Sequence, residues 1–322
     1  MTTFALPLTL PSADTGPDNA FVRGLLAIGH YLRRGLPDAT TLDAAVGGCY
    51  TFAVSPEACA HWWIGAGNAR DLATLGAVTG WELEHHAGDG TEEGYHDYLR
   101  AAVVEELTYG RPVLAYGGWP GIGKYHWGVI TAIGHDAHPV GNAPGAETRP
   151  VQMDGWPYHV VQAKPRGRDT IWTSDLVSRM MSKIPGICGD VVGVETKGLW
   201  HTGASAWDFF RAAVERPGAF CEHCTDQSCL AALVTHLQRD HAALAWFLHY
   251  AWDAACVEDN ALVAPLSDAA AIADPLSAQW AAFDATTALS QRPALAALIA
   301  ETRERWTGLV ACLYLAAPVG TT

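Results

Sequence analysis

The pattern of apolar residues changes once along this chain, near residue 204, and this change limits the possible folds more than any other feature. Between about residues 112 and 200, short apolar runs alternate with glycine and proline, which indicates strands joined by turns. Beyond Ala204, alanine-rich segments carry apolar residues at helical spacing. These segments are Trp207 to Val214, Cys229 to Cys256, Leu266 to Ala273, Ala278 to Ser290 and Pro293 to Leu315. The sequence predicts an α+β chain, with one domain over residues 1–203 and an α-helical region over residues 204–322.

Two helices are predicted ahead of the strands. The first runs from about Asn19 to Arg34 and has a broad apolar face. The second covers Thr91 to Tyr109 and ends at Gly110, a residue type that favours a helix C-terminus. Between them, the apolar and glycine-bearing stretch from Leu42 to Ser55 has a proline close behind it. It therefore has room for a short strand or at most two helical turns.

The strands of the first domain follow in order. Val113 to Tyr116 is the first, and a glycine-rich turn joins it to the strand that His126 opens and Ile133 closes. A loop over residues 134–150 then leads back along Val151 to Asp154, which predicts a β-hairpin with a long tip. Two further extended runs, His159 to Ala163 and Thr170 to Thr173, continue the sheet.

Composition and charge restrict the kinds of molecule that this protein is expected to bind. The 322 residues are 49% hydrophobic and only 17% charged, which indicates a globular protein with a substantial core. A formal net charge of −14 disfavours nucleic acid and anionic membranes. We therefore expect a small-molecule or carrier-bound substrate, with a homodimer as a further option for the helical region. The start of the chain lacks the pattern of a signal peptide, and no apolar run reaches the ~18 residues of a membrane span. We expect a cytoplasmic protein whose eight cysteines are reduced thiols.

Cys49 and His126 suggest nucleophilic chemistry. A thiol needs a nearby imidazole to form thiolate at neutral pH, and the two residues meet in space rather than in sequence. A carboxylate that orients the imidazole would complete the set. Asp154 is the first choice, because we expect it on the strand that returns beside His126, and Asp136 in the preceding turn is the alternative. The competing interpretation is that Cys49 is a buried thiol and His126 an ordinary strand histidine.

Short motifs around these residues resemble papain-like enzymes. The run from Gly48 to Ala53 resembles the segment around the nucleophile of papain-like peptidases. The His126 strand and Met153-Asp154-Gly155 resemble the His and Asp strands of bacteriocin-processing cysteine peptidases. Over most of the chain, the sequence is similar to bacterial proteins like the butirosin biosynthesis protein H. The shared pattern comprises Phe21 to Leu26, Gly47 to Phe52, Gly110 to Leu114, Trp127 to Thr131 and Arg239 to Ala243. This resemblance implies a papain-like fold for the first domain and acyl transfer from a carrier protein, which some members perform.

The sequence departs from that pattern at two places. In papain-like enzymes the cysteine begins the first long helix, where the helix dipole stabilises thiolate, but Asp18 and Asn19 occupy this start here. These enzymes also carry an oxyanion-stabilising Gln about six residues before the nucleophile, whereas the chain has Asp43 ahead of Cys49. A carboxylate repels a developing oxyanion. Either Cys49 acts from a second element, or the fold has lost the chemistry.

Aromatic residues and glycines mark a possible ligand cleft. Trp119 and Trp127 flank the glycine-rich turn, where Gly118 would let backbone approach a ligand closely. The glycine spacing matches neither a dinucleotide fold nor a P-loop, so we expect no nucleotide and no other cofactor.

The helical region holds further thiols and imidazoles. Cys221, Cys224 and Cys229 have spacing compatible with zinc, but a second Cys-x-x-Cys is missing, and we expect packing cysteines and no metal. Four polar residues on one helix are interpreted as a mixed polar face; they are His236, Asp240, His241 and His249.

Two functions remain open from the sequence. The first is a cysteine-dependent reaction of specialised metabolism, either acyl transfer or the hydrolysis of an amide or thioester. In this reaction Cys49 would carry the acyl group as a thioester, and His126 would transfer the proton. The second is a catalytically inactive papain-fold protein that binds a ligand or acts as a scaffold. A third option is a binding module that a metal stabilises at the Cys221 cluster.

Overall fold

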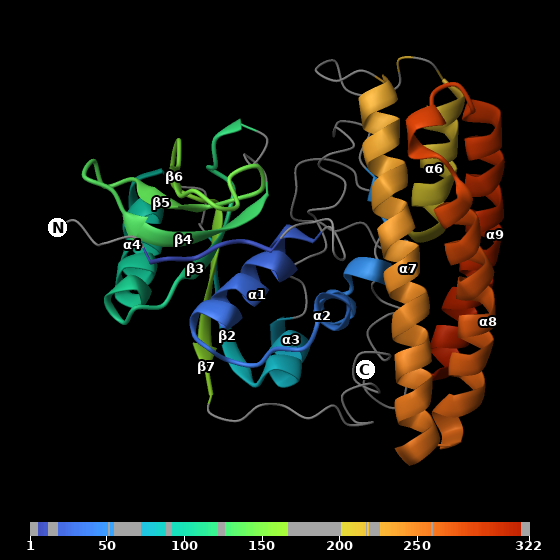
Figure 1. Ribbon diagram of the computed structural model, residues 1–322, viewed down its shortest axis with the longest axis horizontal. Helices are drawn as coiled ribbons and strands as arrows, with labels where there is room; N and C mark the ends of the chain where they lie inside the picture. Colours follow the sequence, from blue (N-terminus) through green and yellow to red (C-terminus); the bar gives the residue numbers. More distant parts are fainter. Residues whose placement is uncertain are drawn as a thin grey trace. The chain divides into compact units, whose positions relative to one another are not determined.

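The structure is a computed structural model of the chain (Figure 1). It describes residues 6–11, 19–50, 52–54, 72–87, 92–121, 126–166, 201–216, 218, 226–258 and 260–316. Within these residues the fold is α+β, as predicted, with eight α-helices and a six-stranded antiparallel sheet. The chain forms two compact units that interleave along the sequence. The sheet unit comprises residues 1–42 and 71–171, and the helical unit comprises residues 43–70 and 172–322. The sequence analysis, by contrast, predicted a single boundary between the two regions, at residue 204.

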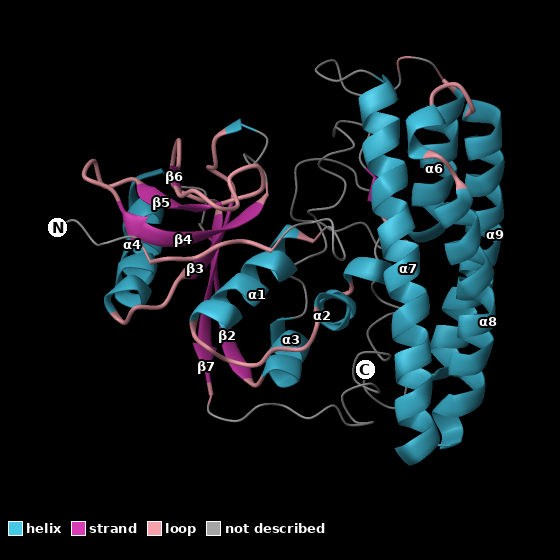
Figure 2. Ribbon diagram, in the orientation of Figure 1, coloured by secondary structure: helices cyan, strands magenta, loops and turns pink. Residues whose placement is uncertain are grey.

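The sheet has the strand order β2-β7-β3-β4-β5-β6, and all neighbouring strands are antiparallel (Figure 2). The strands are β2 (Trp81–Ala87), β3 (Val113–Tyr116), β4 (Trp127–Ile133), β5 (Pro139–Asn142), β6 (Val151–Gln152) and β7 (His159–Pro165). The longest pairing joins β2 and β7 over seven residue pairs. Strands that are distant in the sequence therefore lie side by side, because β7 is inserted between β2 and β3.

Helices pack on both faces of this sheet. α4 (Glu92–Thr108) covers one face, where Leu99, Val103 and Leu107 join Ile130 and Val160 in a buried core. α1 (Ala20–Tyr31) packs against β3 and β4 on the opposite face. Gly24 lies so close to Leu114 and Val129 that a side chain there would collide with them. α3 (Leu72–Thr79) lies beside β2.

The predicted hairpin between the His126 strand and residues 151–154 is wrong. β5 pairs with β4 in its place, and β6 lies at the sheet edge, paired only with β5. β5 was not predicted because it contains Pro, Gly and Asn, which are depleted in strands. Gly141 explains why this segment can still pair: a Cβ at that position would lie against the carbonyl oxygen of Val129.

The helical unit contains four long helices. They are α6 (Gly203–Glu215), α7 (Asp226–Glu258), α8 (Asn260–Ala282) and α9 (Arg292–Ala316), and α8 packs against both α7 and α9. Two helices were predicted over the α8 region, but one continuous helix forms despite Pro265 and Pro275. Leu266, Ala273 and Trp280 are buried along its length. Their packing outweighs the cost of about 3 kcal/mol that each interior proline brings.

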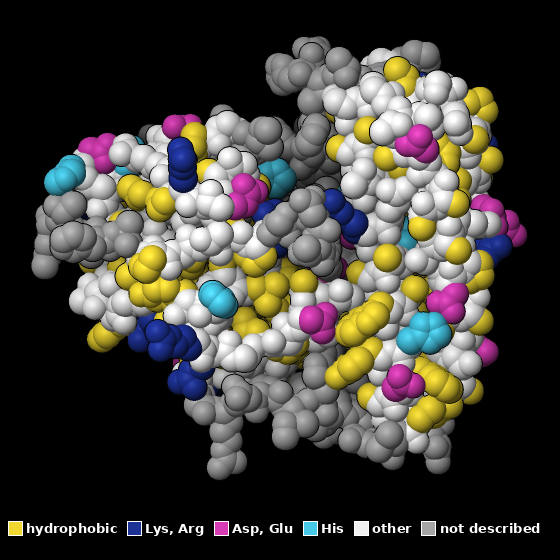
Figure 3. Space-filling model, viewed as in Figure 1, with side chains coloured by type: hydrophobic (Ala, Val, Ile, Leu, Met, Phe, Trp, Pro, Cys, Tyr) yellow, Lys and Arg dark blue, Asp and Glu magenta, His cyan; other side chains and the backbone are white. Residues whose placement is uncertain are grey.

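Short elements complete the described part of the helical unit and its borders. α2 (Ala39–Val46) leads to the 3₁₀-helix η2 (Gly48–Tyr50), and a second 3₁₀-helix, η5 (Ala285–Thr287), follows α8. β1 (Ala53–Val54) pairs with β8 (His201–Thr202). None of the described helices is long and apolar enough to cross a bilayer. On the face shown in Figure 3, carboxylates lie singly over both units rather than in one patch. The run predicted as a strand at Thr170 to Thr173 lies outside the described residues.

Candidate functional site

An asparagine side chain caps the start of α1. Asn19 Oδ1 accepts hydrogen bonds from the amides of Phe21 and Val22, at 3.1 and 3.3 Å. The residue is buried, and it has the extended backbone that an N-cap residue adopts. This is the position where a papain-like cysteine would begin the helix. The amides that would face a thiolate there already bind the Asn19 amide oxygen.

The thiol and the imidazole of the predicted pair lie in different units. His126 is half-buried at the start of β4, and its carbonyl oxygen accepts from the Gly117 amide at 3.2 Å. Cys49 belongs to the helical unit. All eight cysteines of the sequence fall outside the two segments of the sheet unit. The pairing of Cys49 with His126 and Asp154 therefore stays a prediction.

Cys49 is a buried residue of η2, with 4% of its surface exposed. η2 packs against α7. A buried carboxylate lies next to the residue that precedes Cys49, because a Cβ on Gly48 would collide with the side chain of Asp43. The structure thus places Asp43 against the backbone that precedes Cys49. This position suits neither an oxyanion nor a thiolate unless another group offsets the negative charge.

The two predicted tryptophans lie on opposite faces of the sheet. Trp119 is fully buried on the α4 face, where its indole covers Gly128 and its Nε1 donates to the Ala115 carbonyl at 3.2 Å. Trp127 lies on the α1 face, edge-on to Phe21 with ring centroids 4.9 Å apart. Trp119 therefore contributes to the core of the sheet unit, and Trp127 borders the start of α1.

The two candidate aspartates are exposed residues near the sheet edge. Asp154 follows β6, and its amide donates to the Gly118 carbonyl at 2.9 Å. Asp136 accepts from the His138 amide and from Gln152, and these hydrogen bonds hold the pKa of its carboxyl below the usual range. β6 pairs with β5 and not with β4, so Asp154 does not follow a strand that directly adjoins the His126 strand, and its pairing with His126 stays a prediction. Gly118 has φ of +78°, which explains the glycine without a ligand.

Asn142 is a buried polar residue that the sequence analysis missed. It pairs with Val129 at the end of β5, and its Nδ2 donates to the carbonyls of Ala146 and Glu147. Its Oδ1 has no hydrogen-bond partner among the described residues, which is rare for a buried polar atom. An asparagine inside a strand is itself unusual and was the signal that could have identified it.

A chain of ring contacts crosses the sheet beside the start of α1. The members, which we call the aromatic row, are Phe21, Trp127, Tyr116, His159 and His85. Successive ring centroids are 4.9, 5.5, 5.8 and 5.2 Å apart. Beyond Phe21, the row uses one residue from each of β4, β3, β7 and β2, in the order of the strands in the sheet. Phe21 and Trp127 are buried, whereas Tyr116 and His159 are half-exposed and His85 is exposed. The row therefore leads from the core to solvent.

Most of the polar residues of α7 that were predicted as a mixed polar face are buried. His236, Asp240 and His241 are buried, and only His249 is exposed, where it binds Asp274. His236 Nε2 lies 2.7 Å from Asp240 Oδ2. His241 stacks against Trp207 and Trp280, and burial with help from the nearby His236 lowers its pKa to about 3. His241 is therefore neutral at physiological pH.

The cysteine cluster is only partly described. Cys221 and Cys224 lie outside the described residues, and Cys229 is buried in α7. Within the described part of the chain, no group of three His, Cys, Asp or Glu residues is arranged to hold a metal ion.

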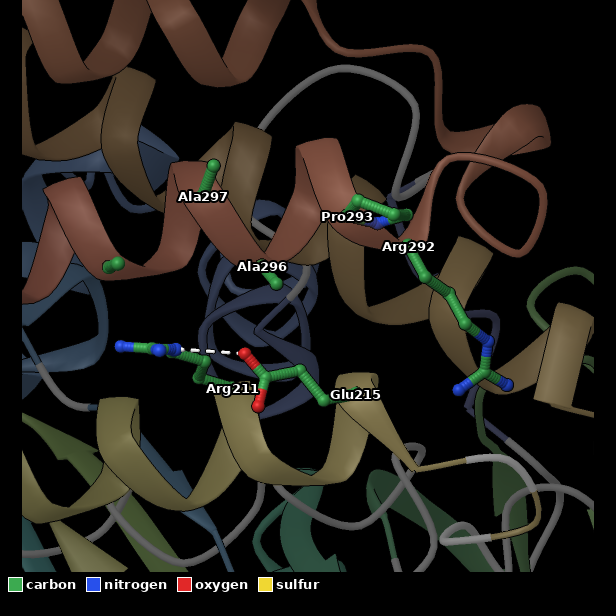
Figure 4. A pocket seen from close by; sticks show the side chains of 7 residues that line it. Arg211, Glu215, Arg292, Pro293, Ala296 and Ala297 are labelled. Carbon is green, nitrogen blue, oxygen red and sulfur yellow. Dashed lines mark hydrogen bonds and ion pairs between the residues drawn. The ribbon is translucent and has the colours of Figure 1, made fainter.

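A surface pocket of about 430 Å³ lies between α6 and α9 (Figure 4). Arg211 and Glu215 both belong to α6 and form an ion pair at 3.0 Å on one side of the pocket. Arg292 donates to the carbonyls of Val214 and Arg216 at the end of α6, and alanines form the rest of the wall. Because both arginines already bind protein acceptors, the pocket is a weaker candidate for an anion site than its composition suggests.

No known protein-family model matches this chain, and a search of curated proteins finds no similar sequence.

Proposed function

We propose that this chain is a catalytically inactive papain-like protein whose sheet unit binds a small molecule or a carrier-bound acyl group. The aromatic row carries this proposal. It brings apolar rings and imidazoles from four strands to one end of the sheet, beside the capped start of α1. A site of this kind combines apolar contact area with a few hydrogen-bonding groups, as ligand sites do.

Three features support binding without catalysis. The helix start that would activate a thiolate is capped by Asn19. The sheet unit that contains His126 has no cysteine. Cys49 is buried, and the carboxylate of Asp43 lies against the preceding residue, Gly48. Each feature acts against a reactive thiolate at neutral pH.

The composition of the aromatic row suggests the ligand class. Phe21 and Trp127 form the apolar, buried end of the row, and His159 and His85 offer ring nitrogens at the exposed end. A ligand with an acyl chain and a polar thioester or amide would match both ends. We place such a protein in the cytoplasm, where carrier-bound acyl thioesters are made.

The test uses an acyl-N-acetylcysteamine thioester, a small mimic of a carrier-bound acyl group. Calorimetry measures binding to the wild type, to Trp127→Leu and to the control Trp246→Leu, which alters a partly exposed tryptophan of the helical unit. Intact mass measures any covalent acyl-protein. We expect reversible binding that Trp127→Leu weakens by about tenfold or more and that Trp246→Leu leaves unchanged, with no covalent product. Equal binding by the two variants, or no binding at all, would contradict the proposal.

A second candidate function is acyl transfer through Cys49. The observation that favours it is the packing of η2 against α7, the helix that carries the His236–Asp240 ion pair. An imidazole oriented by a carboxylate is the partner that a catalytic thiol needs. In the same experiment, a mass increase of one acyl group that disappears in Cys49→Ala would establish this function instead.

A further inference from the structure

Two histidines from neighbouring strands face each other on the exposed end of the sheet. His85 of β2 lies opposite Val161 of β7, and His159 lies opposite Ala87, so the two histidines are diagonal neighbours on one face. His85 Nε2 lies 3.3 Å from His159 Nδ1, and the ring planes are tilted by 32°. One ring nitrogen of each residue therefore points at the other.

From this geometry we infer that His85 and His159 bind a divalent transition-metal ion such as Ni²⁺, Cu²⁺ or Zn²⁺. The inference goes beyond the proposed function and does not depend on it. Two imidazole ligands of a tetrahedral ion, each at about 2.0–2.1 Å, lie about 3.3–3.4 Å apart. The observed separation matches this value. Without an ion, the two ring nitrogens form a hydrogen bond at this distance, which a bound ion would replace.

The surroundings favour a preformed and accessible site. The seven residue pairs between β2 and β7 fix the two backbones, and β7 is held on its other side by β3. Little rearrangement is then needed to bring both nitrogens onto one ion. His85 is exposed and His159 half-exposed, so an ion can enter from solvent.

The ligand set determines which ions fit. Neutral imidazole suits nickel, copper and zinc, and it disfavours magnesium and calcium, which prefer oxygen. Each histidine would use the lone pair of the nitrogen that faces its partner and keep its proton on the other nitrogen. The described residues supply no third His, Cys, Asp or Glu ligand here. Water or atoms of a bound small molecule would complete the coordination.

The test is calorimetric titration of the full chain, free of any affinity tag, with NiCl₂. Nickel is the probe because the cysteines elsewhere in the chain compete better for zinc. The variants are His85→Ala and His159→Ala, and the control is His249→Ala, which removes an exposed histidine of the helical unit. Circular dichroism checks that each variant is folded.

We expect one nickel site in the wild type and in His249→Ala that weakens by about tenfold or more in both sheet variants. Electron paramagnetic resonance of the Cu²⁺-loaded wild type should then show coordination by two nitrogens, and by one nitrogen in either variant. Titrations of His85→Ala and His159→Ala that superimpose on that of the wild type would overturn the inference. So would a wild type that binds no nickel.

Discussion

At the start of α1, the amide of Asn19 caps the helix at the position where the papain-like pattern would place a nucleophile. Its oxygen accepts from two backbone amides that would otherwise remain unsatisfied inside the protein. The cap was predictable, because asparagine before an apolar helical pattern is a recognised start signal. The absence of a cysteine nucleophile at this helix start was also visible in the sequence, since no cysteine lies near this helix.

We predict that Asn19→Ala lowers the free energy of unfolding by about 1 kcal/mol, within a range of roughly 0.5–2 kcal/mol. The loss arises because alanine cannot accept from the amides of Phe21 and Val22. Urea denaturation followed by circular dichroism measures it. Asn19→Asp is the matched control, because its carboxylate can still cap the helix. If the alanine variant were as stable as the aspartate variant, the cap would not contribute as described.

His241 shows how burial changes a residue whose sequence context is ordinary. Its helix carries several polar residues, which suggested a mixed polar face, but tertiary packing stacks its ring against two indoles. The sequence could not reveal this, because Trp207 and Trp280 belong to other helices and their approach depends on the packing of the unit.

The depressed pKa of His241 makes stability depend on pH. The pKa of His241 is about 3 in the folded state, against 6.5 for an ordinary histidine, so the unfolded state binds more protons between these pH values. Stability contributed by the neutral ring is therefore complete above pH 6.5 and declines as the pH falls. We predict that the wild type loses up to about 2 kcal/mol between pH 6.5 and 5 that His241→Phe does not lose. Urea unfolding at each pH measures this, and parallel pH profiles for the two proteins would contradict it.

At the scale of elements, the sequence pattern predicted most of the long helices but missed α3 and two strands of the sheet. The predicted helix from Thr91 to Tyr109 corresponds closely to α4, because its length and apolar spacing leave little choice. β2 was missed because it reads Trp-Glu-Leu-Glu-His-His, a charged pattern that only an edge strand tolerates. β5 was missed for its proline, glycine and asparagine. In both strands the tertiary environment outweighs local propensity.

Gly141 is the residue on which the β4–β5 pairing depends. We predict that Gly141→Ala lowers the free energy of unfolding by about 2 kcal/mol or more, because the new methyl group would collide with the Val129 carbonyl. Gly155→Ala is the control, since a Cβ there meets no atom within 4 Å. Thermal or urea unfolding compares the two. Equal stabilities would mean that β4 and β5 do not approach as closely as described.

At the scale of the molecule, the order of strands decides which residues meet. Tyr116, Trp127 and His159 each stand at the end of a segment that was predicted as a strand. Their proximity was not predictable, because it requires β7 to lie beside β3, a long-range pairing that local pattern does not encode. The same holds for the division into units, which groups residues 43–70 with the helices. It assigns every cysteine to the helical unit, and this assignment is one of the observations behind the proposal of binding without catalysis.

The most direct test of that proposal is the rate of iodoacetamide alkylation at each cysteine between pH 5 and 9, mapped by peptide mass, in the wild type and in His126→Ala. Exposed Cys256 provides the internal reference for an ordinary thiol. Our account predicts that Cys49 reacts more slowly than Cys256 at every pH and that His126→Ala changes neither rate. Rapid alkylation of Cys49 below pH 7 that His126→Ala abolishes would show a thiolate–imidazole pair and contradict the account.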